Sequence, residues 1–405
     1  MSDLPTGGKD EWLAGVLRDR LFQSPHQRLT FADYMNLVLY HPQSGYYSTG
    51  IPTIGRQGDF FTSSHLGADF GELLAQQILQ IWDILGHPHP FQLLEMGAGT
   101  GQCAGDILRF ISTNSPDLLQ SLQYLIIETS AKLIRQQKEQ LSGYLAQGIR
   151  VEWHSWESLP DHSLRGCCFS NEFIDAFPVH QVTVQGGELQ EIYVTLEEGK
   201  LTEVIGELST PMIQEYFELL DINLLASTYP ENYRTEVNLA ALDWLKTLSR
   251  KLKQGYVITI DYGYSASQYY HPQRNNGTLQ CYYQHHRHSN PYVNLGHQDI
   301  TAHVNFTALE KWGELLGLKT LGFTKQALFL MALGLGERLA ALSGGDWGIM
   351  EVLQRRDALH QLMNPDGLGG FGVLVQGKGL TAEQEGIILK ALDVPCDPFN
   401  EKTVR

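Results

Sequence analysis

The hydrophobic pattern of the chain changes its period near residue 90. Apolar side chains repeat at helical spacing from Phe70 to Leu85, and Gly86 is a typical helix stop. After that point, short apolar runs alternate with amphipathic helical segments. The predicted strands are 91–96, 124–128, 149–154 and 167–172, and the helices between them include 130–141. Apolar strands that alternate with helices predict an α/β fold with a parallel sheet covered on both faces.

The second half of the chain interrupts this alternation. Residues 179–207 alternate polar and apolar side chains around two glycine turns, which predicts an antiparallel meander inserted into the main sheet. Thr307 and Glu310 have the spacing of a capping box that opens a helix. The remaining predictions are helices at 211–227 and 231–252, a polar stretch up to about 306, strands at 256–263, 319–326 and 371–376, and two helices within 327–362.

Composition narrows the class of protein. The 405 residues carry a net charge of −16, which argues against nonspecific binding to the phosphates of nucleic acid. No stretch approaches the length of apolar sequence that spans a bilayer, so we expect no membrane insertion. The first 30 residues contain several acids and no apolar signal-peptide core, and the five cysteines are scattered. These features predict a cytoplasmic location.

A glycine-rich turn follows the first apolar strand. Gly97, Gly99 and Gly101 stand at alternate positions between that strand and a helical pattern. A dinucleotide-binding turn has the spacing G-x-G-x-x-G, and here the third glycine comes one residue early. Glu95 precedes the turn, and its charge disfavours a pyrophosphate and suits a cationic sulfonium or ammonium. The turn therefore favours S-adenosylmethionine, with an ordinary tight strand–helix turn as the alternative.

Two further positions extend this candidate binding site. Glu128 ends the second predicted strand, where an acid can accept hydrogen bonds from both hydroxyls of a ribose. Sites for nicotinamide dinucleotides use an acid at the same position. An acid at a strand end that contacts only solvent has the same sequence pattern and is a further alternative. Trp156 follows the third strand, in the loop expected to pass an adenine ring. Plain core packing is the alternative for this tryptophan.

Polar residues crowd the end of the fourth predicted strand. Asn171, Glu172 and Asp175 follow one another closely there, and ligands of open α/β sheets bind at the carboxyl ends of the strands. Two acids at that edge can anchor a cationic substrate or raise each other's proton affinity. Acids placed near a helix N-terminus for its dipole are the alternative. Asp261, at the end of strand 256–263, is a further candidate acid.

Five longer motifs occur together in this chain. They are GYYSTG…IGRQGDFFTSSHLGADFGELL (45–74), LLEMGAGTGQ, NEFIDAFPVHQ, ITIDYGY and GTLQCYYQHHRHSNPYVNLGHQDITAHVNFTAL (277–309). In this order they resemble the MidA family, whose mitochondrial members are complex I assembly factors. The family consists of class I S-adenosylmethionine-dependent methyltransferases, described as protein arginine methyltransferases that make symmetric dimethylarginine. The resemblance covers roughly residues 20–380.

The resemblance implies a Rossmann-like class I methyltransferase with a seven-stranded, mostly parallel sheet whose last strand is reversed. It implies S-adenosylmethionine as the cofactor and a protein substrate, of which a respiratory complex I-type subunit is one candidate. It also implies that Gly58, Asp59 and Phe60 fold near the donor. Together with these three, the predicted donor-binding residues are Glu95, Gly97, Gly99, Gly101, Glu128, Trp156 and Asn171.

The chemistry of an arginine acceptor indicates which acids should line the site. An arginine side chain has a pKa above about 12, so its charge must be held and one proton must leave during or after methyl transfer. Paired carboxylates can do both. We therefore predict that Glu172 and Asp175 form the acceptor side of the site, with Asp261 as the next candidate base.

The His-rich stretch has several interpretations. His285, His286 and His288 lie close together, but no carboxylate or cysteine completes a familiar set of metal ligands, so we expect no metal. A polar loop over the site and a substrate-binding lid are both open, and the resemblance favours the lid. Asp299 and His303 are candidate substrate-binding residues, although His303 could instead cap a helix.

The predicted organisation combines these assignments. The segments are a helical N-terminal extension and donor-site cap (1–90), the first half of the core (91–178), an inserted meander with helices (179–254), the second half of the core with a lid loop at 264–306 (255–380), and a tail (381–405). A non-catalytic assembly factor that binds the donor and a nicotinamide-dependent oxidoreductase are the alternative functions. A small-molecule acceptor and a homodimer also stay open.

Overall fold

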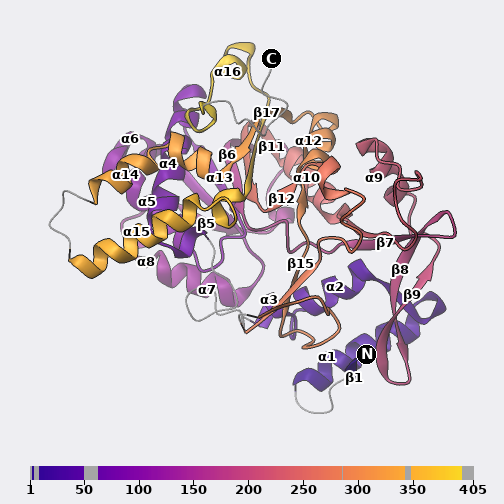
Figure 1. Cartoon of the computed structure of the whole chain (residues 1–405). Coiled ribbons are helices and arrows are strands. Elements are labelled where there is room, and N and C mark those ends of the chain that lie inside the picture. The colour runs from indigo at the N-terminus through magenta and orange to yellow at the C-terminus, as the bar shows by residue number, and fades with distance from the viewer. Residues whose placement is uncertain (1, 4–8, 50–62, 285, 343–347, 395–405) are drawn as a thin grey trace. The chain divides into compact units, whose positions relative to one another are not determined.

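Figure 1 shows the computed structural model of the chain, which describes residues 2–3, 9–49, 63–284, 286–342 and 348–394. The chain forms two compact units, each assembled from three stretches of sequence. The sheet unit comprises residues 61–173, 246–262 and 313–405, and the insert unit comprises residues 1–60, 174–245 and 263–312. The two units are therefore interleaved along the sequence rather than consecutive.

The sheet unit is built on seven strands in the order β17-β18-β11-β6-β3-β4-β5. They are β3 (Phe91–Met96), β4 (Leu122–Ile127), β5 (Val151–His154), β6 (Leu164–Asn171), β11 (Leu252–Asp261), β17 (Lys319–Lys325) and β18 (Gly372–Lys378). The strands from β5 to β11 pair in parallel, whereas β18 is antiparallel to β11 and β17. This confirms the expected seven-stranded, mostly parallel sheet with a reversed last strand.

The sheet unit contains helices, several of which pack apolar residues against this sheet. The helices are α4 (Asp69–Ile84), α5 (Gln102–Asn114), α6 (Pro116–Ser121), α7 (Ala131–Gln140), α8 (Ser142–Ala146), α13 (Gln326–Ala332), α14 (Leu335–Ala341), α15 (Ile349–Met363) and α16 (Ala382–Gly386), with single 3₁₀ turns at Ser63–His65, Trp156–Ser158, Leu368–Gly370 and Lys390–Leu392. Ile78, Ile107 and Phe329 lie in one apolar cluster with the strand residues Phe169 and Ile258. Removal of this apolar surface from water is the main force that holds the helices on the sheet.

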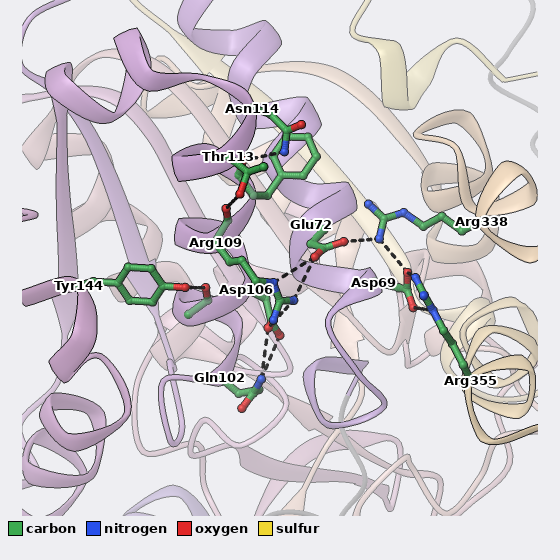
Figure 2. Close-up of polar contacts among 12 residues, drawn as sticks. Asp69, Glu72, Gln102, Asp106, Arg109, Thr113, Asn114, Tyr144, Arg338 and Arg355 are labelled. Atoms are coloured by element: carbon green, nitrogen blue, oxygen red, sulfur yellow. Dashed lines mark hydrogen bonds and ion pairs between the residues drawn. The ribbon is translucent and has the colours of Figure 1, made fainter. Parts of the chain in front are cut away.

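A network of ion pairs ties four of these helices together (Figure 2). Asp69 on α4 accepts hydrogen bonds from Arg338 on α14, at 2.7 Å, and from Arg355 on α15, at 2.8 and 3.1 Å. Glu72 accepts from Arg338 and, at 3.0 Å, from Arg109 on α5. Burial alone would raise the pKa of Asp69, but Arg355 and Arg338 outweigh this effect and hold its pKa below the usual value. The charges therefore stabilise one another across helices that are distant in sequence.

The insert unit contains a separate antiparallel sheet. Its strands are β1 (Ser2–Asp3), β2 (Arg28–Thr30), β7 (His180–Gln185), β8 (Glu188–Glu197), β9 (Lys200–Gly206) and β10 (Arg234–Val237). They lie in the order β1-β9-β8-β7-β10, and β2 also pairs with β8. The predicted meander is confirmed as β7 to β9, but the prediction that it joins the main sheet is wrong. Its strands pair with one another and with β1, β2 and β10 instead.

Helices and short strands complete the insert unit. They are α1 (Lys9–Gln23), α2 (Phe31–Tyr40), α3 (Tyr46–Thr49), α9 (Met212–Leu220), α11 (Ala266–Tyr269), β12 (Gly263–Tyr264), β13 (Gln280–Tyr283), β14 (His286–His288), β15 (Asp299–Thr301), β16 (Val304–Asn305) and a 3₁₀ turn at Pro25–Gln27. Two helices, α10 (Leu239–Lys251) and α12 (Phe306–Leu315), begin in the insert unit and end in the sheet unit. Two apolar cores support this unit, one around Phe31 and Leu39 and one around Phe217 and Tyr270.

Three predicted elements differ from the structure. The helix predicted at 231–252 begins only at Leu239, because residues 234–237 form β10 and pair with β7. The stretch predicted as a polar loop contains the three-stranded sheet β14-β13-β15. The described part of 327–362 contains residues of three helices, α13, α14 and α15, rather than two. In the first two cases strand pairing decides the local structure, and the periodicity of the sequence does not show which strands pair.

The predicted capping box at Thr307 and Glu310 is also wrong. Helix α12 begins at Phe306, and the Asn305 side chain accepts a hydrogen bond of 3.2 Å from the Ala308 backbone amide. The Thr307 hydroxyl instead accepts a hydrogen bond of 3.0 Å from the Ala266 amide. Asn305 therefore caps the helix, as asparagine commonly does.

Two general features of the chain bear on its class. Within the described ranges, none of the helices has both the length and the apolar composition needed to cross a membrane. Cys103, Cys167, Cys168 and Cys281 are buried free thiols. Burial raises the pKa of the Cys168 thiol to about 12, so this thiol stays protonated and packs as an apolar side chain.

Candidate active site

The glycine turn connects β3 to α5 and has the backbone that only glycine adopts readily. Gly97, Gly99 and Gly101 have φ values of +74°, +52° and +86°. A Cβ atom on Gly97 would lie 2.8 Å from Cδ2 of Phe173, which is closer than carbon atoms approach. The positive φ favours glycine at all three positions, and at Gly97 close packing against Phe173 also leaves no room for a Cβ atom.

Gln137 on α7 holds this turn from the side. Its buried Nε2 donates a hydrogen bond of 2.8 Å to the Gly99 carbonyl oxygen, and its Oε1 accepts one of 2.7 Å from Trp153 Nε1. Gln137 Nε2 also lies 3.4 Å from an oxygen of Glu128. The sequence reasoning missed this residue. The available signal was a polar glutamine on the buried face of a predicted amphipathic helix.

Glu128 directly follows β4. One of its oxygens accepts hydrogen bonds of 2.8 Å from the backbone amides of Thr129 and Ser130. Burial raises the pKa of the Glu128 carboxyl, while these amides and Gln137 oppose the shift. Ser130 caps α7 by accepting a hydrogen bond from the Leu133 amide. The carboxylate is thus oriented by the backbone at the carboxyl edge of the sheet, next to the side chain that holds the glycine turn.

Glu95 lies inside the core rather than at an open edge. Its side chain is 3% exposed and accepts a hydrogen bond of 2.7 Å from the Tyr124 hydroxyl. Burial raises the pKa of Glu95 to about 7, although the bond from Tyr124 opposes the shift. At neutral pH this acid is therefore close to half protonated. Its negative charge is a weaker argument against a pyrophosphate than the sequence alone implied.

The end of β6 combines a strained acid with a buried amide. Glu172 has φ of +49°, a left-handed conformation that costs energy for a residue with a Cβ atom. Its carboxylate accepts hydrogen bonds from the Ser63 amide, at 3.0 Å, and from Asn171 Nδ2, at 3.2 Å. The Asn171 Oδ1 atom is buried and has no hydrogen-bond partner among the described residues. Such an atom is a candidate acceptor for a polar group of a ligand.

Asp261 at the end of β11 is fully buried. Its Oδ2 accepts a hydrogen bond of 3.1 Å from the Phe173 amide, and its Oδ1 accepts one of 2.9 Å from the Tyr262 amide. The Phe173 ring is the same ring that packs against Gly97. Asp261 therefore positions the segment that follows β6, and its predicted role as a base stays a prediction.

Asp175 and Asp299 belong to the insert unit, whereas Glu172 belongs to the sheet unit. The pairing of Glu172 with Asp175 therefore stays a prediction. Within the insert unit, the Ala302 amide donates a hydrogen bond of 2.9 Å to the Asp175 carbonyl oxygen. This bond fixes the Asp175 segment at the end of β15, the strand that carries Asp299.

His303 lies between β15 and β16, and its ring stacks on that of Tyr264 with centroids 4.9 Å apart. Burial, helped by the charge of Arg274, lowers the pKa of His303 to about 4, so the ring is neutral at physiological pH. The helix-capping interpretation of His303 is wrong because Asn305 fills that role. Its predicted part in substrate binding stays a prediction.

Of the other predicted site residues, the structure describes Trp156. Trp156 begins a single 3₁₀ turn after β5 and is half-buried. The predicted donor contacts Gly58, Asp59 and Phe60 lie outside the described residues, as does His285. Across the described ranges, no three His, Cys, Asp or Glu side chains gather in a way that could hold a metal ion.

These features suit an adenosyl ligand with a short charged tail. The glycine turn leaves room for close backbone approach, and Glu128 is oriented beside it. Asn171 carries a buried oxygen that has no hydrogen-bond partner among the described residues. All three lie at the carboxyl edge of the parallel strands, where open α/β sheets bind their ligands. The residues of the sheet unit therefore fit the donor that the glycine spacing indicated.

Comparison with curated proteins gives relatives over most of the chain. A Drosophila melanogaster protein named "Protein arginine methyltransferase NDUFAF7 homolog, mitochondrial" is 28% identical over 77% of this chain and 72% of its own length. The Homo sapiens protein named "Protein arginine methyltransferase NDUFAF7, mitochondrial" is 29% identical over 84% of this chain and 78% of its own length. The chain thus spans most of these relatives.

These names correct one prediction. The relatives are named mitochondrial, so the predicted cytoplasmic location is wrong. The prediction rested partly on unpaired cysteines. Unpaired cysteines indicate a reducing rather than an oxidising compartment, but they do not indicate which reducing compartment.

A solved structure and a family model complete the comparison. A superfamily member from Burkholderia thailandensis, bound to S-adenosyl-homocysteine, is 32% identical and superimposes with a TM-score of 0.83 over 96% of this chain and 98% of its own. The family model for S-adenosyl-L-methionine-dependent methyltransferases matches residues 73–324, more than half of the chain. This excludes the nicotinamide-dependent alternative. The chain therefore belongs to this family of S-adenosylmethionine-dependent methyltransferases, the one that the MidA resemblance indicated.

Proposed function

We propose that the methyl acceptor is an arginine side chain of a protein. The observation that carries this proposal is the name protein arginine methyltransferase, which belongs to relatives aligned over 77–84% of this chain. We further propose symmetric dimethylarginine as the product and a respiratory complex I-type subunit as the substrate, both of which rest on the MidA resemblance. A homodimer is also proposed, and light scattering on the purified chain tests it.

The donor is assigned to the carboxyl edge of the sheet unit. We assign the glycine turn, Glu128 and Asn171 to donor binding, and the predicted contacts Glu95, Trp156 and Gly58 to Phe60 are part of the same assignment. S-adenosylmethionine supplies a methyl group bonded to a cationic sulfonium when it is bound. In this proposal Gln137 supports the conformation of the turn, because its amide donates a hydrogen bond to the Gly99 carbonyl oxygen.

The acceptor chemistry is assigned to the acids that follow β6. Glu172 and Asp175 would hold the guanidinium, and one carboxylate would receive the proton that leaves the nitrogen once the nitrogen–carbon bond has formed. The left-handed backbone of Glu172 supports a functional role, since strained residues concentrate at active sites. Asp261 is the second candidate for the base, although its bonds to two backbone amides favour a positioning role.

Methyl transfer to proteins of a cell lysate tests the proposal. The purified chain is incubated with lysate and radiolabelled S-adenosylmethionine, and labelled residues are identified by mass spectrometry. We expect label on arginine, and roughly 10²-fold less of it with Glu172→Gln if this acid holds or deprotonates the acceptor. Glu139→Gln, an exposed acid on α7, is the matched control. Label on lysine or on a small molecule only would contradict the arginine assignment.

A further inference from the structure

One face of the antiparallel strand pair β13–β15 carries four polar side chains, of which Asp299 and Thr301 are buried and Gln280 and Tyr282 are half-buried. Tyr282 on β13 stands directly opposite Asp299 on β15, and Gln280 stands opposite Thr301. Opposed residues of an antiparallel pair point to the same face, so these four polar side chains share one side of the strand pair. The alternate residue on each strand, Cys281 or Ile300, enters the apolar core on the other side.

Tyrosines from the N-terminal helices reach this polar face. The Tyr47 hydroxyl lies 2.8 Å from both carboxylate oxygens of Asp299. Tyr40 stacks on Tyr47 with centroids 5.4 Å apart, and its hydroxyl donates a hydrogen bond of 2.8 Å to the carbonyl oxygen of Ala176. Because Ala176 follows Asp175, this bond and the one from Ala302 bring the Asp175 segment to the same place.

Thr301 supplies an independent sign that this face is built for a ligand. Its side chain is 1% exposed, and its hydroxyl has no hydrogen-bond partner among the described residues. A buried hydroxyl without a partner costs roughly 1–3 kcal/mol, so its presence needs a reason. Strand alternation points the Thr301 hydroxyl to the side that carries Asp299. A donor or acceptor on a bound ligand would satisfy it.

We propose that Asp175, Asp299 and Thr301, together with the rings of Tyr40, Tyr47 and Tyr282, form a subsite that binds the guanidinium group of the acceptor. The proposal deepens the proposed function and rests on it, because it names the side chains that would recognise an arginine. It assigns a binding role to Thr301 and to the three tyrosines, and it pairs Asp175 with Asp299 rather than with Glu172 alone.

The chemistry of the subsite matches a planar cation. A guanidinium pairs with carboxylates through parallel N–H donors and stacks on aromatic rings. Cation–π contacts are strongest where the ring and the cation are removed from water. Burial, with the nearby charges of Asp299 and Asp175, raises the pKa of Tyr40 and of Tyr47. Both phenols are therefore neutral, and their rings can face a cation while their hydroxyls donate hydrogen bonds.

A binding experiment with small probes tests the subsite. Ligand-observed NMR measures binding of ethylguanidinium, propylammonium and ethylurea to the full-length chain saturated with S-adenosyl-homocysteine. The first probe mimics the arginine head group, the second is a non-planar cation, and the third is a neutral shape mimic. We expect ethylguanidinium to bind most tightly, and Asp299→Asn to weaken it at least tenfold while S-adenosyl-homocysteine binding stays within twofold of wild type.

Thr301→Val keeps the test informative if Asp299→Asn is poorly folded. This substitution removes only the unpartnered hydroxyl, so the fold should be at least as stable, while ethylguanidinium binding falls several-fold. Thr320→Val is the matched control. Its hydroxyl is also buried without a partner among the described residues, but it lies on β17 at the end of the sheet opposite the carboxyl edge. This control should bind the probes as wild type does.

The outcomes separate the two proposals. Unchanged ethylguanidinium binding and unchanged lysate methylation in both Asp299→Asn and Thr301→Val would overturn the subsite, even when the label is found on arginine. Label found only on a residue other than arginine would overturn the proposed function, whatever the variants do. Loss of probe binding together with loss of arginine labelling, at normal donor affinity, supports both.

Discussion

The amide of Gln137 donates a hydrogen bond of 2.8 Å to the backbone carbonyl oxygen of Gly99. This bond joins α7 to the centre of the glycine turn, and the same side chain accepts a hydrogen bond from Trp153 on β5. The turn is therefore supported by a buried polar side chain from the next strand–helix repeat. Its conformation depends on this support as well as on its own glycines.

Gln137→Glu should reduce donor binding. The substitution keeps the shape and the oxygen that accepts from Trp153, but it removes the N–H that donates to Gly99. An acid oxygen would then face a carbonyl oxygen. We expect S-adenosyl-homocysteine affinity, measured by calorimetry, to fall about tenfold, and stability to fall by about 1–3 kcal/mol. Gln147→Glu, the same change at an exposed residue just after α8 in the same unit, should alter neither quantity.

Glu128→Gln tests the ribose contact without removing the local backbone bonds. The glutamine carbonyl can still accept the amide hydrogens of Thr129 and Ser130, so thermal unfolding of the ligand-free chain should change little. Donor affinity should fall by about tenfold or more, because a charge-assisted hydrogen bond is worth about 1.5–3 kcal/mol. A large loss of stability with normal affinity would instead assign Glu128 a purely structural role.

Buried Glu95 should make stability depend on pH. Its pKa rises from 4.5 to about 7 on folding, so the folded state binds the proton more tightly than the unfolded state does. The stability that this proton provides is complete below pH 4.5 and is lost as the pH rises through 7. Glu95→Gln should therefore gain stability relative to wild type between pH 5 and pH 8, by up to about 3 kcal/mol.

Denaturant unfolding of both proteins across that pH range measures the effect of Glu95. Glu139→Gln replaces an exposed acid of the same unit and should run parallel to wild type. If the difference between Glu95→Gln and wild type did not vary with pH, Glu95 would not be the group that titrates.

Arg338 and Arg109, two arginines of the charge network in Figure 2, should contribute unequally to the stability of the fold. The Arg338 side chain is 17% exposed and bonds Asp69 and Glu72, whereas Arg109 is 48% exposed. Arg338 serves two acids at once, so among the described residues its loss leaves Asp69 with Arg355 alone and Glu72 with Arg109 alone. Arg338→Gln should therefore cost about 2 kcal/mol. Arg109→Gln should cost about 1 kcal/mol or less, since water screens its pairs. Denaturant unfolding that gave equal losses for the two variants would contradict this order.

The architecture of the sheet unit could be predicted from the sequence. Residues 91–96 were predicted as a strand with the bounds that β3 has, and Ala104, Ile107, Leu108 and Ile111 form the buried face of α5. Buried strands and amphipathic helices produce a periodic pattern of apolar and polar residues in the sequence, because each side chain faces either the core or water. The glycine turn could also be predicted from the sequence, and in the structure all three glycines have positive φ.

Other features of the fold and of the site depend on tertiary contacts. Residues 234–237 became a strand because β7 offered them a pairing edge, and Thr307 lost the cap of α12 to Asn305. The support of Gly99 by Gln137 and the meeting of Tyr47 with Asp299 join residues far apart in the chain. Such contacts leave no periodic signal. A buried polar side chain is stable only beside a partner, and folding determines which residue that partner is.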